Sequence, residues 1–94
     1  MYVFSVNANT PKAIDGFGVG ADVPFIVYIN FKDLFGAEQL CRLYLLQQGF
    51  ERPVIDKRKL IEEKFLNDRK LIEADKALKE ALESGYSIQV FSSH

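Results

Sequence analysis

Residues 23–31 form a nearly continuous hydrophobic run, Val-Pro-Phe-Ile-Val-Tyr-Ile-Asn-Phe. In an extended chain, alternate side chains point to opposite faces, and in this run both faces are hydrophobic. β-Branched and aromatic residues also pack well on a pleated surface. A strand of this kind needs cover on both sides, so we expect residues 23–31 to be the central strand of a sheet.

Three shorter segments also predict strands. They are residues 2–6, 50–55 and 86–91. The segment 50–55 contains Pro53, which cannot donate a hydrogen bond to a neighbouring strand. It is therefore expected at an edge of the sheet.

The connection between the first two strands holds two local signals. Thr10 can cap a helix, Pro11 suits its first position and Gly16 can end it, so a helix of one or two turns is expected. A glycine-rich run follows, made of Gly16, Phe17, Gly18, Val19 and Gly20. Such a run can present backbone N–H groups to an anion. However, it leads into a strand and not into a helix, which favours a flexible or bulged lead-in.

Two longer helices are predicted, over residues 33–48 and 57–84. In the first, Asp33 can cap the start and Gly49 the end. Hydrophobic residues surround nearly all of this helix, so it is largely buried or offers one face to a partner. A straight helix over the second segment would be about 43 Å long, in a domain whose radius of gyration should be about 12 Å. We therefore expect it to break near residues 67–68, where Asp68 can cap a new helix.

Together these elements predict one domain, residues 1–94, of the α/β class, with α+β as the alternative. The expected architecture is a small two-layer sandwich with a three- or four-stranded mixed sheet, covered by helices 33–48 and 57–84. A right-handed crossover through the first helix would place residues 50–55 parallel to the central strand.

Composition restricts the function classes. The net charge of −1 argues against a surface devoted to gripping a phosphate backbone. A single cysteine permits no internal disulfide, and no hydrophobic run reaches the roughly 18–20 residues that cross a bilayer. The N-terminal residues lack a basic segment. These features predict a cytoplasmic protein without a membrane partner.

No constellation of residues indicates catalysis, a metal or a cofactor. His94 is the only histidine and the last residue, and a general base must be held in place. Cys41 lies among leucines, where a cysteine usually serves as a small core residue. Asp15 and Asp22 flank the glycine-rich run, but two carboxylates do not make a metal site. The sequence therefore predicts a protein that is not an enzyme.

A group of basic residues is the more informative candidate site. It consists of Arg52, Lys57, Arg58, Lys59 and Lys64. Three of them would occupy the first turn of helix 57–84, where the helix dipole disfavours positive charge. Such a conflict can mark a functional site for an acidic protein, RNA or a phosphate group. A solvated face, balanced by neighbouring glutamates, is the favoured interpretation.

Aromatic residues are numerous, with eight Phe and four Tyr. They suit a core or a protein interface, and no stretch matches the aromatic-basic motifs of RNA-binding sheets. The ending, Ala77-Leu-Lys-Glu-Ala-Leu-Glu-Ser-Gly-Tyr-Ser-Ile-Gln-Val-Phe91, resembles the last helix and strand of barstar-type inhibitors and some bacteriocin immunity proteins. The resemblance covers about a sixth of the chain, and the pronounced acidity of those inhibitors is missing. It implies a small binding protein.

The leading hypothesis is a non-enzymatic protein-binding module, of inhibitor, immunity or regulatory-adaptor type, that acts through an aromatic-rich or charged-helix surface. Its partner would be another protein, and a homodimer is also considered. The alternative is a nucleic-acid or phosphate-ligand binder that uses residues 57–59 and the glycine-rich loop 16–20.

Overall fold

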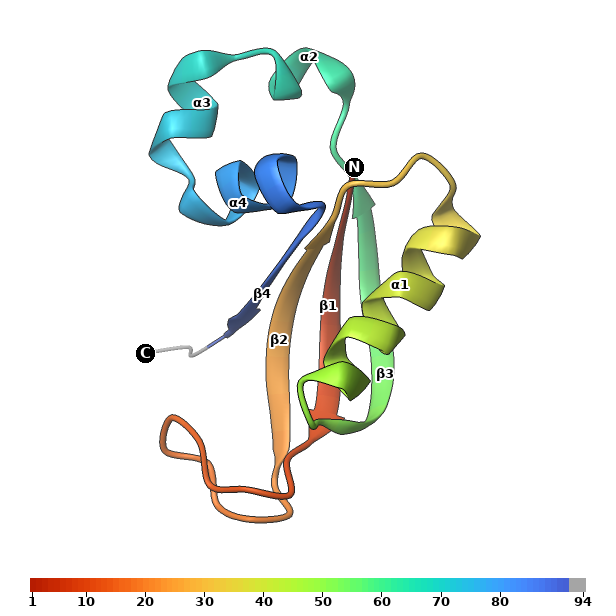
Figure 1. Ribbon diagram of the computed structural model, residues 1–94, viewed down its shortest axis with the longest axis vertical. Coiled ribbons are helices and arrows are strands. Elements are labelled where there is room, and N and C mark those ends of the chain that lie inside the picture. Colours follow the sequence, from red (N-terminus) through yellow and green to blue (C-terminus); the bar gives the residue numbers. More distant parts are fainter. Residues whose placement is uncertain (92–94) are drawn as a thin grey trace.

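The described residues, 1–91 of a computed structural model, form four strands and four helices (Figure 1). In chain order these are β1 (Tyr2–Asn9), β2 (Asp22–Ile29), α1 (Leu34–Gln47), β3 (Glu51–Leu60), α2 (Glu63–Leu66), α3 (Arg69–Ala74), α4 (Lys76–Ser84) and β4 (Tyr86–Val90). The fold is therefore a small α+β domain with helices packed on a four-stranded sheet.

The strands lie in the order β3-β1-β2-β4, and every neighbouring pair is antiparallel. The prediction that residues 23–31 hold a central strand is confirmed, although β2 ends at Ile29. The predicted mixed sheet is wrong. The crossover through α1 does give β3 the direction of β2, but it carries β3 past β1, so β1 separates the two strands.

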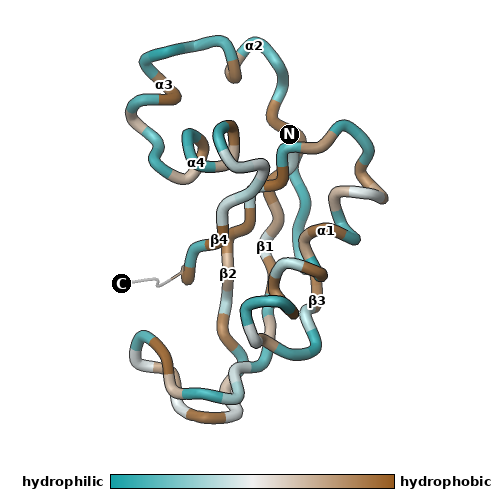
Figure 2. Tube along the Cα trace, in the orientation of Figure 1, coloured by the Kyte–Doolittle hydropathy of each residue, from teal (hydrophilic) through white to brown (hydrophobic). Residues whose placement is uncertain are grey.

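The main core lies between the sheet and α1. Alternate residues of the two middle strands are buried, among them Phe4 and Val6 of β1 and Phe25 of β2. α1 contributes a narrow buried stripe of Ala37, Cys41 and Leu45. These side chains form one cluster, and Figure 2 shows the corresponding hydrophobic colouring along the middle of the sheet.

The helices α2, α3 and α4 form an arch at the end of the sheet where β2 and β3 finish (Figure 1). A second cluster of buried residues holds α4 there, made of Met1, Leu78 and Ala81, with Tyr28 packed against it. Tyr28 points away from α1, because its neighbours Val27 and Ile29 are in the main core. The arch thus belongs to the face opposite α1, and neither α2 nor α3 contains a buried residue.

The break predicted near residues 67–68 is confirmed. α2 ends at Leu66, and the Asp68 carboxylate accepts hydrogen bonds from the N–H groups of Lys70 and Leu71 at the start of α3. A second break at Asp75 was not expected. The predicted helix start at residue 57 is wrong, because β3 continues along β1 as far as Leu60.

The short helix predicted after Thr10 is also wrong. The Thr10 N–H donates to the Ala21 carbonyl, which extends the β1–β2 hairpin, and the Lys12 N–H donates to the Thr10 hydroxyl. Asp15 and Gly16 then have φ values of 41° and 86°. Two consecutive positive φ angles are typical of a type I′ turn, for which Asp-Gly is a preferred pair.

Candidate functional site

The basic residues of β3 lie on both faces of the sheet. In the register with β1, Arg58 is opposite Phe4, on the side covered by α1. Lys57 and Lys59 are opposite Ser5 and Val3, on the other side. The expectation that these three residues form the first turn of a helix is wrong, so the conflict with a helix dipole does not arise.

Arg58 is already engaged within the molecule. Its Nε lies 2.6 Å from Oε1 of Glu38 on α1, with side chains that are 44% and 17% exposed. The ion pair connects the helix to the edge of the sheet. The ion pair accounts for an arginine at position 58, so no external ligand is needed to explain it.

Arg52 and Lys64 also lie apart from Lys57 and Lys59. Arg52 has a φ of 50° near the start of β3, five positions from Lys57, which corresponds to about 17 Å along a strand. Lys64 lies in α2, with its Nζ 3.4 Å from Glu62 and 5.1 Å above the Phe65 ring. Only Lys57 and Lys59 therefore share a strand face as a pair.

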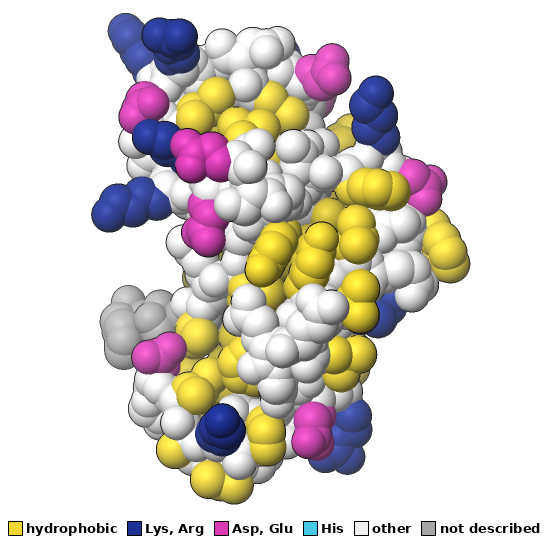
Figure 3. Space-filling view, viewed as in Figure 1, with side chains coloured by type: hydrophobic (Ala, Val, Ile, Leu, Met, Phe, Trp, Pro, Cys, Tyr) yellow, Lys and Arg dark blue, Asp and Glu magenta, His cyan; other side chains and the backbone are white. Residues whose placement is uncertain are grey.

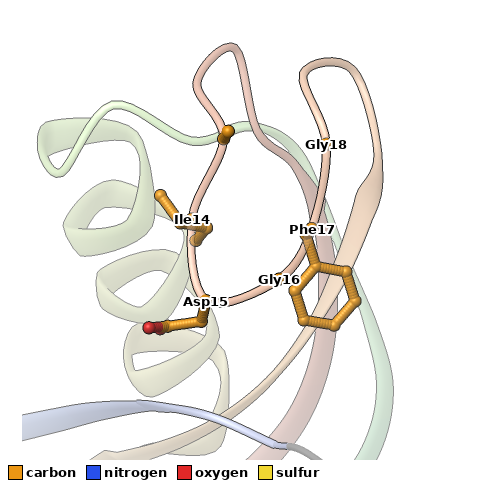
Figure 4. Close-up of a pocket in the computed structure, with 6 residues that line it drawn as sticks. Ile14, Asp15, Gly16, Phe17 and Gly18 are labelled. Carbon is orange, nitrogen blue, oxygen red and sulfur yellow. The ribbon is translucent and has the colours of Figure 1, made fainter.

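The glycine-rich residues Gly16, Phe17, Gly18 and Gly20 belong to an open loop whose hollow measures about 370 Å³ (Figure 4). The N–H groups of Phe17, Gly20 and Ala21 donate to the carbonyls of Ile14, Thr10 and Gly18. They are therefore not directed at a ligand. Among residues 1–91, Asp15 is the only charged residue that lines the hollow, and its carboxylate would repel an anion. This geometry supports the interpretation of the loop as a structural lead-in to β2.

A more enclosed hollow of about 280 Å³ lies under the arch, and the sequence did not indicate it. Its lining is formed by Tyr28, Lys59, Leu60, Ile61, Phe65, Leu71, Asp75 and Leu78. The Tyr28 hydroxyl donates to Asp75 Oδ2 at 3.3 Å. Burial, and then the Asp75 charge and this hydrogen bond, raise the pKa of Tyr28.

Within the described part of the chain, the outer side of α1 carries several exposed hydrophobic side chains. Phe35, Leu43 and Leu46 are 69%, 47% and 51% exposed, and their spacing places them on one side of the helix. Phe31, also exposed, lies over the position that a Cβ of Gly36 would occupy. We call Phe31, Phe35, Leu43 and Leu46 the α1 outer face; hydrophobic side chains are prominent over α1 in Figure 3.

Cys41 occupies the core, as expected. Its side chain is fully buried, and burial raises the pKa of its thiol to about 12, with smaller effects from Arg42 and Glu38. Within residues 1–91, no group of three or more His, Cys, Asp or Glu side chains could hold a metal ion. His94 lies outside the described residues.

No protein-family model matches the chain, and no curated protein or solved structure matches it either. Among the described helices, none is long and apolar enough to span a bilayer.

Proposed function

We propose that the chain is a small non-enzymatic protein-binding module, of inhibitor, immunity or regulatory-adaptor type, that binds its partner through the α1 outer face. The observation that supports this proposal is the exposure of Phe35, Leu43 and Leu46 on a helix whose opposite side is packed on the sheet. Exposed hydrophobic side chains that gather on one side of a helix are characteristic of interaction surfaces.

The energetics favour such a role. Complete burial of a Phe or Leu side chain contributes about 1.5–3 kcal/mol. A helix that inserts a few such residues into a groove of a partner is a common mode of recognition. Phe31 enlarges this surface, since the missing side chain of Gly36 lets its ring lie close to the helix.

The experiment compares two variants of the tagged protein in affinity purification from the native source. The first changes Phe35, Leu43 and Leu46 to Ser. The second changes Val19 and Val54, which are 75% and 63% exposed elsewhere, to Ser. We expect a partner that the wild type and the second variant retain and the first variant loses, with the loss reproduced by calorimetry on the purified pair. Equal binding by both variants would contradict the proposal.

The alternative, a nucleic-acid or phosphate-ligand binder, now depends mainly on Lys57 and Lys59. Both side chains are exposed and lie on the sheet face away from α1. Two lysines on one strand can contact neighbouring phosphates, but Arg58 is paired with Glu38 and does not join them. Under this alternative, binding would weaken steeply as the salt concentration rises, whereas binding through a hydrophobic surface would not.

A further inference from the structure

The two edges of the sheet differ in how they are protected. β3 contains Pro53, two irregularities in its register with β1 and the charged run 57–59. Proline, bulges and lysines are the features by which natural proteins prevent edge strands from pairing with other chains. β4, with the sequence Tyr-Ser-Ile-Gln-Val, contains no charge and no proline, and its register with β2 is regular.

The hydrogen bonds to β2 show which groups of β4 remain free. The Asn30 N–H donates to the Gly85 carbonyl at 2.9 Å, and the Phe91 N–H donates to the Pro24 carbonyl at 2.8 Å. In an antiparallel pair, every second residue of a strand bonds to its neighbour and the residues between point outward. Since residues 85 and 91 bond inward, 87 and 89 do as well. The N–H and C=O groups of Tyr86, Ile88 and Val90 are therefore directed to the outer edge.

We propose that this edge is a homodimer interface, in which β4 pairs antiparallel with β4 of a second copy around a two-fold axis at Ile88. This register joins the outward-directed residues of both strands. Ile88 faces the partner's Ile88, and Tyr86 faces the partner's Val90. Each of these pairs can exchange two backbone hydrogen bonds. The chain turns into α4 at Gly85, which limits the pairing to the length of β4.

The side chains explain why a second copy suits this edge. On the α1 side, β4 carries three partly buried side chains, those of Tyr86, Ile88 and Val90. The same three side chains of the second copy would pack beside them and bury more of their surface. On the opposite side, Ser87 faces the partner's Gln89. β4 itself brings no charges together, so the strand is complementary to itself, and cross-strand hydrophobic pairs add stability; the Glu80 carboxylate of α4, which accepts from the Ser87 hydroxyl, lies beside this strand.

The dimer would contain one continuous sheet with both α1 helices on the same side, because the two-fold axis is perpendicular to the sheet. The α1 outer face of each copy would stay accessible. The inference is thus independent of the proposed function, and each can fail alone.

Cross-linking through Ile88→Cys tests the register. Paired residues of this type have Cα atoms about 5.5 Å apart, within the range that a disulfide can bridge. The control is Val54→Cys, a more exposed site on the protected edge. The native Cys41 is buried and should not react. Under mild oxidation, we expect the Ile88→Cys protein to form covalent dimers at least tenfold faster than the control; equal rates would overturn the proposal.

Light scattering on the wild type over a concentration series gives the second measurement. We expect a mass that rises from one chain to two, and the same rise in the variant with Phe35, Leu43 and Leu46 changed to Ser. Ile88→Pro removes an outward-directed N–H and no hydrogen bond to β2, so it should weaken dimerisation more than Ile88→Ala, which also loses the partly buried side chain but keeps the N–H; circular dichroism checks that both variants fold. A wild-type mass of one chain at millimolar concentration, or a dimer lost on changing the α1 outer face, would overturn the proposal.

Discussion

The hydroxyl of Tyr28 donates a hydrogen bond to the carboxylate of Asp75, 47 positions later in the chain, at 3.3 Å. The same carboxylate accepts from the Leu78 N–H at 3.1 Å and so caps α4. Asp75 therefore separates α3 from α4 and also connects the arch to the central strand. One side chain thus caps the helix that follows it and also forms a contact with a strand far away in the sequence.

We predict that Asp75→Ala lowers the free energy of unfolding by about 1–2 kcal/mol, as is usual for the loss of a helix cap, and that Asp75→Asn costs clearly less. Asparagine keeps one oxygen that can accept from the Leu78 N–H, and its amide N–H can donate to the Tyr28 hydroxyl in place of the second carboxylate oxygen. Urea denaturation of the three proteins measures the difference. A loss from Asp75→Asn as large as that from Asp75→Ala would show that the charge of Asp75, and not its cap, stabilises the arch.

A second prediction concerns the ionisation of Tyr28. Burial is the largest cause of its raised pKa, followed by the negative charge of Asp75 and the hydrogen bond to it. The folded protein therefore keeps this proton at a pH where the unfolded chain has lost it, and the associated stability decreases as pH rises above about 10. The difference in ultraviolet titration between the wild type and Tyr28→Phe isolates this phenol.

The matched variant for that titration is Asp75→Asn, which removes the charge and retains a side chain of similar size. We expect the pKa of Tyr28 to fall in this variant towards its ordinary value, with burial still holding it above that value. An unchanged titration curve would mean that Asp75 does not act on the phenol in solution.

Local signals predicted some of these features and not others. The cap at Asp68 and the hydrophobic strand 23–31 depend on neighbouring residues, and both predictions agree with the structure. Residues 57–60 lack the alternation of hydrophobic and polar side chains that is typical of a half-buried strand. They are extended because they pair with residues 2–5 of β1. A contact between residues so far apart in the chain overrides local propensity.

The candidate surfaces also differ in whether neighbouring residues or distant contacts determine them. The turn at Asp15 and Gly16 carries a recognisable Asp-Gly signal that the helix interpretation missed. The hollow under the arch has no comparable signal, because Tyr28, Lys59, Phe65 and Asp75 come from four different segments. The exposure of the α1 outer face likewise depends on which side of an all-round hydrophobic helix meets the sheet.

A third prediction concerns Cys41, whose thiol has a pKa of about 12 because it is buried. At pH 8 its thiolate fraction is negligible, and the thiolate is the reactive form. We expect the folded protein to react with a thiol reagent at least a hundredfold more slowly than the same protein in denaturant. Fast labelling without denaturant would show that α1 detaches readily from the sheet.

The ionisation of Cys41 also predicts how stability depends on alkaline pH. The thiol has a higher pKa in the folded protein than in the unfolded chain, so the unfolded state loses its proton first. Stability should therefore decrease as pH rises above about 9. The variant Cys41→Ala removes this contribution, and its unfolding free energy should fall less steeply between pH 9 and 11.

The last prediction separates the protein-binding proposal from the phosphate-binding alternative. If phosphate groups are the ligands, changing Lys57 and Lys59 to Gln should weaken the binding of a short single-stranded RNA strongly, and raising the salt concentration should weaken it further. Arg58→Gln is the matched control, because that side chain pairs with Glu38 on the other face. Fluorescence anisotropy at low and moderate salt measures both effects. No binding by the wild type at low salt, or equal effects of the two sets of changes, would contradict the alternative and leave the α1 outer face as the binding surface to pursue.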